Sequence, residues 1–334
     1  MPYIGIDLHK HYTHFVVLNQ KGDVVKRARI PSEREAVIKF FSELEWPKVA
    51  ALEATRNWYW FYDLVEKMGV SLNLVAPHKM RVIAESTVKT DKVDARVIAE
   101  LLRVGYLPTC YVPSPEVRQL RELLRQRAFV VKMRTGVKNR IHGLLDKLGV
   151  KHPFANLFTG RGLKFLKSLE LGGVYQLELE QCLALLEFLT ELEKRSSKLI
   201  RQLAGESEDC RLLMTIPGIG CHNALLIMAE IGDIHRFSNG EKYASYCGLV
   251  PTVHISERTV RYGHLRPQGN PWLRWAYVEA AHIAIRKSVR LANLYTRVAR
   301  KKGAQKAIGA VARELAVISF YVLKHRTEFK DRLW

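Results

Sequence analysis

Four acidic residues in the first third of the sequence stand where a metal-binding site would need them. Asp7 ends a predicted strand in the segment GIDLHK, and Glu53 ends another in ALEATRN. Asp91 and Asp94 are three residues apart near the start of a predicted helix, so both project from one face. Carboxylates gathered at one sheet edge repel one another unless a hard divalent cation neutralises them. The set therefore predicts a site for Mg²⁺, with Mn²⁺ as a substitute, that acts on phosphodiesters.

Each of these residues has a simpler interpretation when it is taken alone. An aspartate after a strand is commonly a turn former, and Asp91 and Asp94 can serve only as acidic residues at a helix N-terminus. His9 and His11 flank Asp7, but an imidazole ligand suits a transition metal better than Mg²⁺. We therefore expect His9 to have a structural or supporting role beside the carboxylates.

The chain is strongly basic, which indicates a polyanionic partner. It contains 53 Lys and Arg against 33 Asp and Glu among 334 residues, a formal net charge of +20. Residues 118–151 hold ten of these cations and two acids, Glu122 and Asp146. A solvated helix face normally mixes signs, so this segment predicts a contact with nucleic-acid backbone. The residues assigned to that contact are Arg118, Arg121, Arg125, Lys132, Lys138 and Arg140.

Alternating short strands and helices are expected to hold the carboxylates. Strands are predicted at 3–7, 13–19, 24–30, 49–53 and 71–76, and helices after Ser32, at 58–68 and at 91–103. Ser32 and Glu35 have the spacing of a capping box at the first helix. Three antiparallel strands followed by strand–helix alternation predict an α/β ribonuclease H-like domain over residues 1–112.

Proline and glycine mark the organisation of the remaining chain. Pro113-Ser114-Pro115 ends the first domain, and predicted helices at 116–148 and 177–203 form a helical, coiled-coil arm over residues 113–207. That arm is either a plain helical hairpin or also a contact with a second protomer. Residues 208–334 are predicted to form a mainly α domain. Within it, Gly218 and Gly220 lie in a turn between apolar helices, typical of a helix–hairpin–helix that holds nucleic-acid backbone.

A second basic segment, residues 256–274, follows in that domain. Its cations are Arg258, Arg261, Arg266 and Arg274, and its one acid is Glu257. Gly263, Gly269 and Pro271 interrupt any long helix here. We therefore expect a basic, loop-rich strip that contacts nucleic acid.

Three segments, GIDLHK, LEATRN and KTDKVDA in that order, resemble the acidic signature of insertion-sequence transposases of the IS110 type. That family includes Piv-like DNA invertases and bridge-RNA-guided recombinases. The similarity extends over nearly the whole chain, since the last third matches too. It implies a RuvC-like first domain with Asp7, Glu53, Asp91 and Asp94 as its acidic tetrad, and Mg²⁺-dependent DNA strand exchange. It also implies a structured guide RNA as a partner.

The resemblance also points to a catalytic serine in the C-terminal domain. Ser256 is predicted to be the nucleophile that attacks a DNA phosphate, because Arg258 and Arg261 are close enough in sequence to stabilise the transition-state oxygens. Members of the family commonly have Ser-Ser-Gly-Gly at this point, whereas this chain reads ISER over residues 255–258. The alternatives are a hydrogen-bonding role for Ser256, or Ser245 in YASYCG as the nucleophile.

The leading interpretation is a transposase or recombinase that cuts and rejoins DNA. Strand exchange needs at least two active sites, which predicts a homo-oligomer, either a dimer or a tetramer. The alternatives are a RuvC-like Holliday-junction resolvase, for which the first domain would suffice, and a non-catalytic nucleic-acid-binding protein. The sequence shows no secretory signal, no apolar run of about 20 residues and no metal-finger spacing of its five cysteines. We therefore expect a cytoplasmic protein, not a secreted, membrane or zinc-finger protein.

Overall fold

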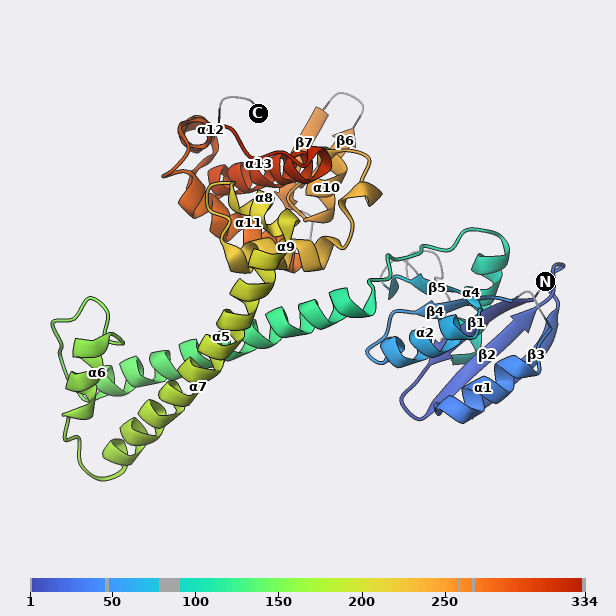
Figure 1. The fold of residues 1–334 in the computed structure, drawn as a ribbon, viewed down its shortest axis with the longest axis horizontal. Helices are drawn as coiled ribbons and strands as arrows, with labels where there is room; N and C mark the ends of the chain where they lie inside the picture. Colours follow the sequence, from blue (N-terminus) through green and yellow to red (C-terminus); the bar gives the residue numbers. More distant parts are fainter. Residues whose placement is uncertain (1, 46–47, 78–90, 257–258, 266–267, 332–334) are drawn as a thin grey trace. The chain divides into compact units, whose positions relative to one another are not determined.

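The computed structural model describes residues 2–45, 48–77, 91–256, 259–265 and 268–331 (Figure 1). For residues 91–93, 253–256 and 259–262, which lie in a helix and two strands, only the backbone is described. The chain forms two compact units, unit 1 over residues 1–112 and unit 2 over residues 113–334. No helix among the described residues is long and apolar enough to cross a bilayer.

Unit 1 is built on a five-stranded mixed sheet. Its strands are β1 (Tyr3–Leu8), β2 (Tyr12–Leu18), β3 (Val24–Pro31), β4 (Val49–Glu53) and β5 (Ser71–Val75), in the order β3-β2-β1-β4-β5. Short turns join β1, β2 and β3, so these strands are antiparallel. By contrast, β4 is parallel to β1, and β5 is parallel to β4. The five predicted strands are confirmed, each within one residue of its predicted ends.

Helices cover both faces of the sheet. α1 (Arg34–Ser42) and α2 (Trp58–Lys67) pack on one face, and α4 (Asp91–Arg103) packs on the other. Side chains alternate along β1, so Ile4 and Ile6 enter the core beneath α1 and α2. The same alternation turns Gly5 and Asp7 toward α4, which puts a predicted site residue beneath that helix.

The start of α1 differs from the prediction. The helix begins after Glu33, whose side chain caps no backbone amide. The Ser32 hydroxyl instead donates to the backbone oxygen of His9 at 2.9 Å and lies 2.8 Å from the Thr13 hydroxyl. The predicted capping box of Ser32 and Glu35 is therefore wrong, because Ser32 ties the end of β3 to the turn between β1 and β2.

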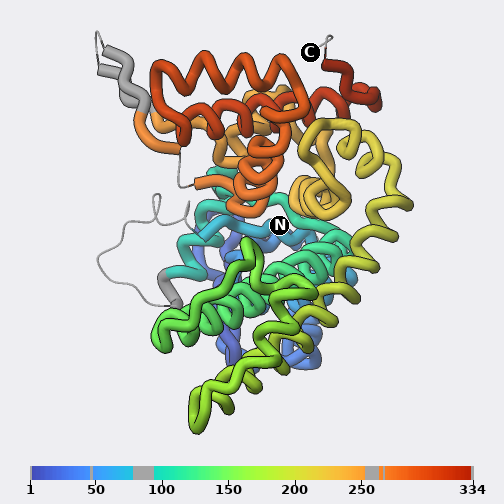
Figure 2. Tube along the Cα trace, turned by 90° about the vertical axis from the view of Figure 1, so that its left-hand side faces the viewer, coloured from blue at the N-terminus to red at the C-terminus, as the bar shows by residue number. Residues whose placement is uncertain are grey.

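Two long antiparallel helices form the arm of unit 2, the part of the unit that spans α5 to α7. α5 (Pro115–Lys147) and α7 (Gly173–Glu206) lie side by side, and α6 (Gly160–Lys167) packs against both at their far end (Figure 1, Figure 2). Pro115 is the first residue of α5, where a proline has no helical amide to lose, and the Ser114 hydroxyl accepts from the amide of Val117. Both long helices predicted from the sequence are confirmed.

A cluster of helices completes unit 2. They are α8 (Glu208–Met214), α9 (Cys221–Ile231), the 3₁₀ helix η1 (Ile234–Arg236), α10 (Gly240–Tyr246), α11 (Pro271–Ala284), α12 (Val289–Lys302) and α13 (Ala304–His325). Their apolar core also takes in Leu124 of α5 and Ile200 of α7. The base of the arm is therefore part of the same core as the helices that follow it.

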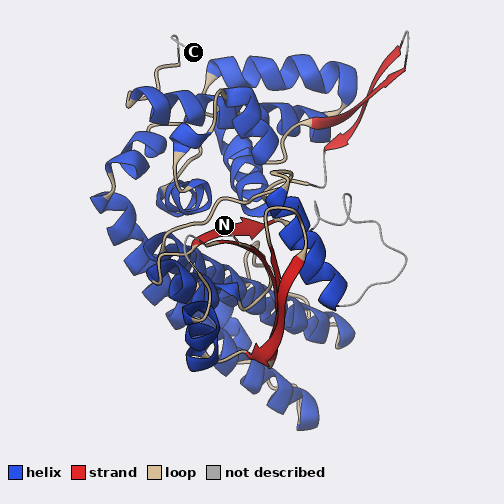
Figure 3. Cartoon of the chain, turned by 90° about the vertical axis from the view of Figure 1, so that its right-hand side faces the viewer, coloured by secondary structure: helices blue, strands red, loops and turns tan. Residues whose placement is uncertain are grey.

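An antiparallel hairpin interrupts these helices. β6 (Pro251–Ser256) pairs with β7 (Thr259–Leu265), and Figure 3 shows the two strands projecting from the helical cluster. The prediction of a loop-rich strip is therefore wrong for this part of residues 256–274. The β-branched residues Val253, Ile255 and Val260 favour extended strands, and this preference outweighs the single Gly263.

Candidate active site

Asp7 and Glu53 occupy neighbouring positions at one edge of the sheet. β1 and β4 run parallel with Ile6 opposite Leu52, so the residues that follow these two are also neighbours. Ile6 and Leu52 belong to the core beneath α1 and α2. Alternation therefore places Asp7 and Glu53 together on the face that α4 covers.

α4 runs antiparallel to β1 across this face. It crosses β1 at Gly5, where an added Cβ would lie 1.9 Å from the backbone oxygen of Ala95. Only a glycine permits so close an approach of helix and strand. At the other end of the helix, Arg103 donates to the backbone oxygen of Gln20, in the turn between β2 and β3. The first turn of α4 therefore lies toward the carboxyl end of β1.

This direction brings the second pair of predicted acids to the same edge. Asp91 precedes Ala95 by four residues, about 6 Å along a helix axis. Asp7 follows Gly5 by two residues, about 7 Å along a strand. The backbone of the first turn of α4 thus lies above the carboxyl end of β1. Asp94 is half-buried there, whereas the side chain of Asp91 lies outside the described residues.

The Asp7 carboxylate is buried and held by a neighbour. Asp7 is 8% exposed, and its Oδ2 accepts a hydrogen bond from His9 Nε2 at 3.0 Å. A donor of this kind orients a carboxylate, which is the supporting role expected of His9. In the part of the chain that the structure describes, no group of three or more His, Cys, Asp and Glu side chains is close enough to hold a metal ion. The donor chemistry of Asp7, Glu53 and Asp94 is carboxylate oxygen, which suits Mg²⁺.

Ser256 is the last residue of β6 and pairs with Thr259 of β7. The described backbone also places Arg261 on β7, while the side chains of both Ser256 and Arg261 lie outside the description. Arg258 and Arg266 lie outside the described residues altogether. Ser245, the alternative nucleophile, is half-buried on α10.

The basic stripe of α5 is largely used inside unit 2. Arg127 donates to Glu193 Oε1 of α7 at 2.9 Å, and Arg134 pairs with the same carboxylate. Arg140 lies 2.9 Å from Glu178 Oε1. These ion pairs hold the two arm helices together. Their partners lie more than 35 residues apart in sequence, so a count of charges along α5 alone does not identify them.

Two of the arginines assigned to nucleic acid bind the end of α9 instead. Arg121 donates to the backbone oxygens of Ala229 at 2.7 Å and Glu230 at 3.0 Å, where the carbonyls of a helix C-terminus attract a cation. Arg125 donates to Glu230 Oε1 at 2.9 Å. Arg118 is 5% exposed, so its guanidinium is buried as well. Arg118 and Arg121 are therefore used inside the fold and are not free for the predicted contact, whereas the Arg125 side chain is 34% exposed and its contact with nucleic acid stays a prediction.

The remaining members of that predicted set differ in exposure. Lys132 and Arg140 are exposed, and the side chain of Arg140 is 67% exposed. Lys138 Nζ lies 5.0 Å from the centre of the Phe158 ring. Burial against this ring, and the nearby Arg134, lower the pKa of the Lys138 ammonium. Lys132 and Arg140 are therefore the exposed residues of the six, although Arg140 also pairs with Glu178.

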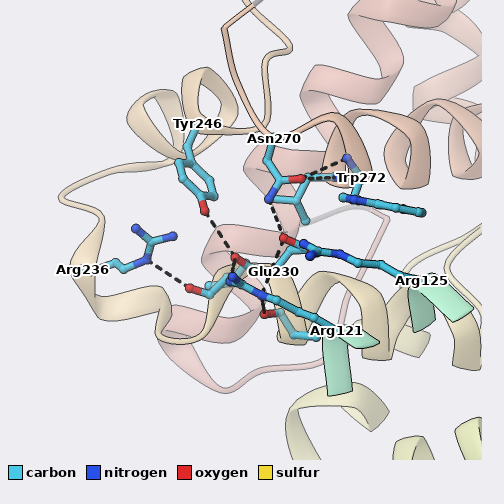
Figure 4. Close-up of polar contacts among 10 residues, drawn as sticks. Arg121, Arg125, Glu230, Arg236, Tyr246, Asn270 and Trp272 are labelled. Carbon is cyan, nitrogen blue, oxygen red and sulfur yellow. Dashed lines mark hydrogen bonds and ion pairs between the residues drawn. The ribbon is translucent and has the colours of Figure 1, made fainter. Parts of the chain in front are cut away.

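Glu230 is a buried acidic residue that was not predicted from the sequence. It is 2% exposed on α9 and binds Arg121 and Arg125 of α5, while its Oε2 accepts from Asn270 Nδ2 at 2.7 Å (Figure 4). Asn270 caps α11, directly after the hairpin segment. Tyr246 donates to the backbone oxygen of Glu230 at 3.3 Å. The signal that could have found it is a single glutamate inside the apolar helix segment ALLIMAEI.

The two glycines of the turn between α8 and α9 have different surroundings. Gly218 has φ +89°, and an added Cβ would lie 2.2 Å from the backbone oxygen of Ala280 on α11. Packing alone thus accounts for Gly218. Gly220 is exposed at the N-cap of α9, with no atom within 4 Å of an added Cβ.

Arg274 is a further member of the predicted basic strip of residues 256–274. Its guanidinium packs against Gly248.

Comparison with known proteins gives matches over most of the chain. The family model DEDD_Tnp_IS110, described as a transposase, matches residues 4–149, and the model "Transposase IS116/IS110/IS902 family" matches residues 210–296. The transposase for insertion sequence element IS1111A of Coxiella burnetii is 26% identical over 341 aligned positions, covering 98% of this chain and 91% of the relative. A probable family 20 transposase of Pseudomonas aeruginosa is 28% identical, covering 85% of this chain and 84% of the relative.

A third relative matches from end to end. The transposase for insertion sequence element IS1328 of Yersinia enterocolitica is 24% identical, covering 98% of both chains. The first family model spans Asp7, Glu53, Asp91 and Asp94, and the second spans Ser245 and Ser256. The resemblance seen in the sequence is therefore confirmed, and the chain belongs to the IS110 family of insertion-sequence transposases.

Proposed function

We propose that this transposase cuts and rejoins DNA with a metal-dependent carboxylate site in unit 1 and a serine nucleophile in unit 2. The observation that carries the proposal is the convergence of Asp7, Glu53 and the first turn of α4 at one sheet edge. The strand order β3-β2-β1-β4-β5, with the first three strands antiparallel, supports a ribonuclease H-like, RuvC-like interpretation of unit 1.

Asp7, Glu53, Asp91 and Asp94 are the residues that would hold Mg²⁺ or Mn²⁺. Such an ion neutralises charge on the phosphate and orients the reacting oxygens. His9 fixes one oxygen of Asp7 by its hydrogen bond. Gly5 lets α4 approach β1 closely enough for the acidic first turn to reach the strand end.

A cleavage assay on DNA that carries the ends of the element tests this site. We expect Asp7→Asn and Asp94→Asn to abolish strand cleavage while leaving DNA binding near normal, because the loss of a negative charge does not weaken the attraction to phosphate. Glu66→Gln, an exposed charge change on α2, is the matched control and keeps its cleavage. Cleavage by wild type in EDTA, or by Asp7→Asn in Mg²⁺, would overturn the metal site.

Ser256 is our proposed nucleophile in unit 2. Its Oγ loses a proton and forms an ester bond to a DNA phosphate, while the bridging P–O bond to the neighbouring sugar breaks and the released sugar hydroxyl takes up a proton. The ester keeps the phosphodiester bond energy available for rejoining. Arg258 and Arg261, near Ser256 in sequence, suit the non-bridging oxygens through bidentate hydrogen bonds.

The partners follow from the same chemistry. DNA at the element ends and at the target is the substrate, and rejoining two cut ends needs more than one active site, which supports a dimer or tetramer. A structured RNA is proposed as the group that selects the target, in line with the family resemblance and the net charge of +20. Purification of the protein from cells that carry the whole element, followed by ribonuclease treatment, tests this. Loss of target-specific binding after the treatment is expected, and unchanged specificity would contradict an RNA partner.

A further inference from the structure

The densest unbalanced charge of the chain lies near its C-terminal end. Nine Lys and Arg, and no Asp or Glu, lie between Glu279 and Glu314, a stretch of 34 residues. Residues 118–151, which begin in α5 and extend past its end, have a net charge of +8 over the same length. The second family match ends at residue 296, so most of these cations lie beyond the matched domain.

Five of the nine cations form one exposed surface at the junction of α12 and α13, which we call the α12 patch. Its members are Arg297, Arg300, Lys301, Lys302 and Lys306. α12 packs on α13 through its apolar side, which contains the buried Leu291 and the partly buried Leu294 and Tyr295. Arg297, Arg300 and Lys301 are spaced i, i+3 and i+4, so they are neighbours on the helix surface, and all three are exposed. Figure 1 shows α12 and the β6–β7 hairpin toward opposite ends of the helical cluster.

The α12 patch differs from α5 in how its charges are used. Five arginines of α5, namely Arg121, Arg125, Arg127, Arg134 and Arg140, are paired with Glu193, Glu178 or Glu230. Near the patch, Arg290 pairs with Glu314 and Arg313 pairs with Glu241. None of the five patch cations forms an ion pair with any side chain that the structure describes. Their charge is therefore available to a partner from outside the unit.

Stabilisation of the helix itself explains only part of the patch. Arg300, Lys301 and Lys302 lie in the last turn of α12, where cations interact favourably with the helix dipole. Lys306, however, lies in the first turn of α13, where a cation is unfavourable. Arg297 precedes the last turn of α12. Helix stabilisation therefore does not account for the cations at Arg297 and Lys306.

We propose that the α12 patch binds the phosphate backbone of duplex DNA, in a contact that does not depend on sequence. The inference rests on the proposed DNA strand exchange. Duplex DNA carries one negative charge per about 1.7 Å of its axis, so a helix face about 8 Å long meets several phosphates. No aromatic side chain among described residues 286–306 is exposed, which favours backbone contact over the base stacking typical of single strands.

The test compares two full-length variants with the same loss of charge. The patch variant combines Arg297→Gln, Arg300→Gln, Lys301→Gln and Lys302→Gln. The control variant combines Lys194→Gln, Arg195→Gln, Lys198→Gln and Arg201→Gln on α7, where the cations are also exposed and Lys194 and Arg195 have Glu191 beside them. Binding of a short fluorescent duplex of arbitrary sequence is measured by anisotropy over a range of salt concentrations in EDTA, so that cleavage plays no part.

For the patch variant, we expect Kd to rise about tenfold or more, and the slope of log K against log salt to become shallower by up to about 0.9 for each phosphate that is no longer bound. The control variant should keep the wild-type slope, and Arg297→Lys with Arg300→Lys should keep it too. An unchanged salt slope in the patch variant overturns the inference. A lower Tm with unchanged DNA binding also overturns it, because the cations would then only stabilise the helix. Reduced binding of single-stranded RNA or anionic vesicles, with duplex binding intact, also overturns it.

The outcome is separable from that of the proposed function. If wild type cleaves DNA and Asp7→Asn does not, but the patch variant keeps its salt slope, only the inference fails. If the patch variant loses its slope while Asp7→Asn still cleaves, only the carboxylate site fails.

Discussion

Asp7 owes its orientation to a histidine two residues away. The 3.0 Å hydrogen bond from His9 Nε2 fixes one carboxylate oxygen, at the sheet edge that Asp7 shares with Glu53. A donor that orients a metal ligand in this way commonly contributes a factor of about 10 to 100 in metal affinity.

We therefore expect His9→Ala to raise the Mg²⁺ concentration needed for half-maximal cleavage by about 10- to 100-fold, with activity recovered at high Mg²⁺. A titration of cleavage against Mg²⁺ measures this shift. His11→Ala, which changes an exposed histidine on the same turn, should leave the titration unchanged. Equal shifts in both variants would show that His9 acts through the fold of the turn and not through Asp7.

Glu230 is the residue on which the base of the arm depends. Its carboxylate is 2% exposed and faces Arg121, Arg125 and Asn270. Removing one partner of a buried ion pair leaves the other charge uncompensated, so we expect Glu230→Ala to lower the free energy of unfolding by about 3–5 kcal/mol. Urea unfolding of the full-length protein, followed by circular dichroism, gives this value.

Glu241→Ala is the matched control for that measurement. Glu241 pairs with Arg313, but its side chain is 62% exposed, so its loss should lower the free energy of unfolding by at most about 1 kcal/mol. Similar losses in the two variants would contradict the assignment of Glu230 as the buried junction.

Elements with a strong periodic pattern could be predicted from the sequence, whereas the hydrogen-bond and ion-pair partners of individual side chains could not. The five strands of unit 1 and the two arm helices follow from their apolar spacing. The predicted capping box is wrong because Ser32 bonds to the β1–β2 turn. The pairing of α5 arginines inside unit 2 could not be foreseen, because Glu193 and Glu230 lie far away in sequence. Asp7 and Glu53 could be placed together because strand order and alternation fix their positions.

The turn between α8 and α9 holds two glycines that should respond differently to substitution. Gly218→Ala must place a Cβ 2.2 Å from the backbone of α11 at φ +89°, so we expect it to lower the free energy of unfolding by at least about 2 kcal/mol. Gly220→Ala meets no atom within 4 Å and should cost little. Thermal unfolding of both variants checks the difference, and equal Tm values would contradict the packing role of Gly218.

Across the molecule, charge and chemistry are divided between the two units. Unit 1 holds the acidic edge, while unit 2 holds the arm, the β6–β7 hairpin and the α12 patch. The basic residues of this chain, whose net charge is +20, therefore do not form one surface. Some of them pair with acidic residues inside the arm, and others face solvent on α12.

The proposed strand exchange passes through a covalent bond between Ser256 and DNA and depends on the carboxylate edge of unit 1. Trapping of protein–DNA adducts on a nicked substrate that carries an element end examines both requirements in one experiment. We predict an adduct with wild type and Ser245→Ala in Mg²⁺, and none with Ser256→Ala, with Asp94→Asn, or with wild type in EDTA. An adduct formed by Ser256→Ala would contradict the proposed mechanism.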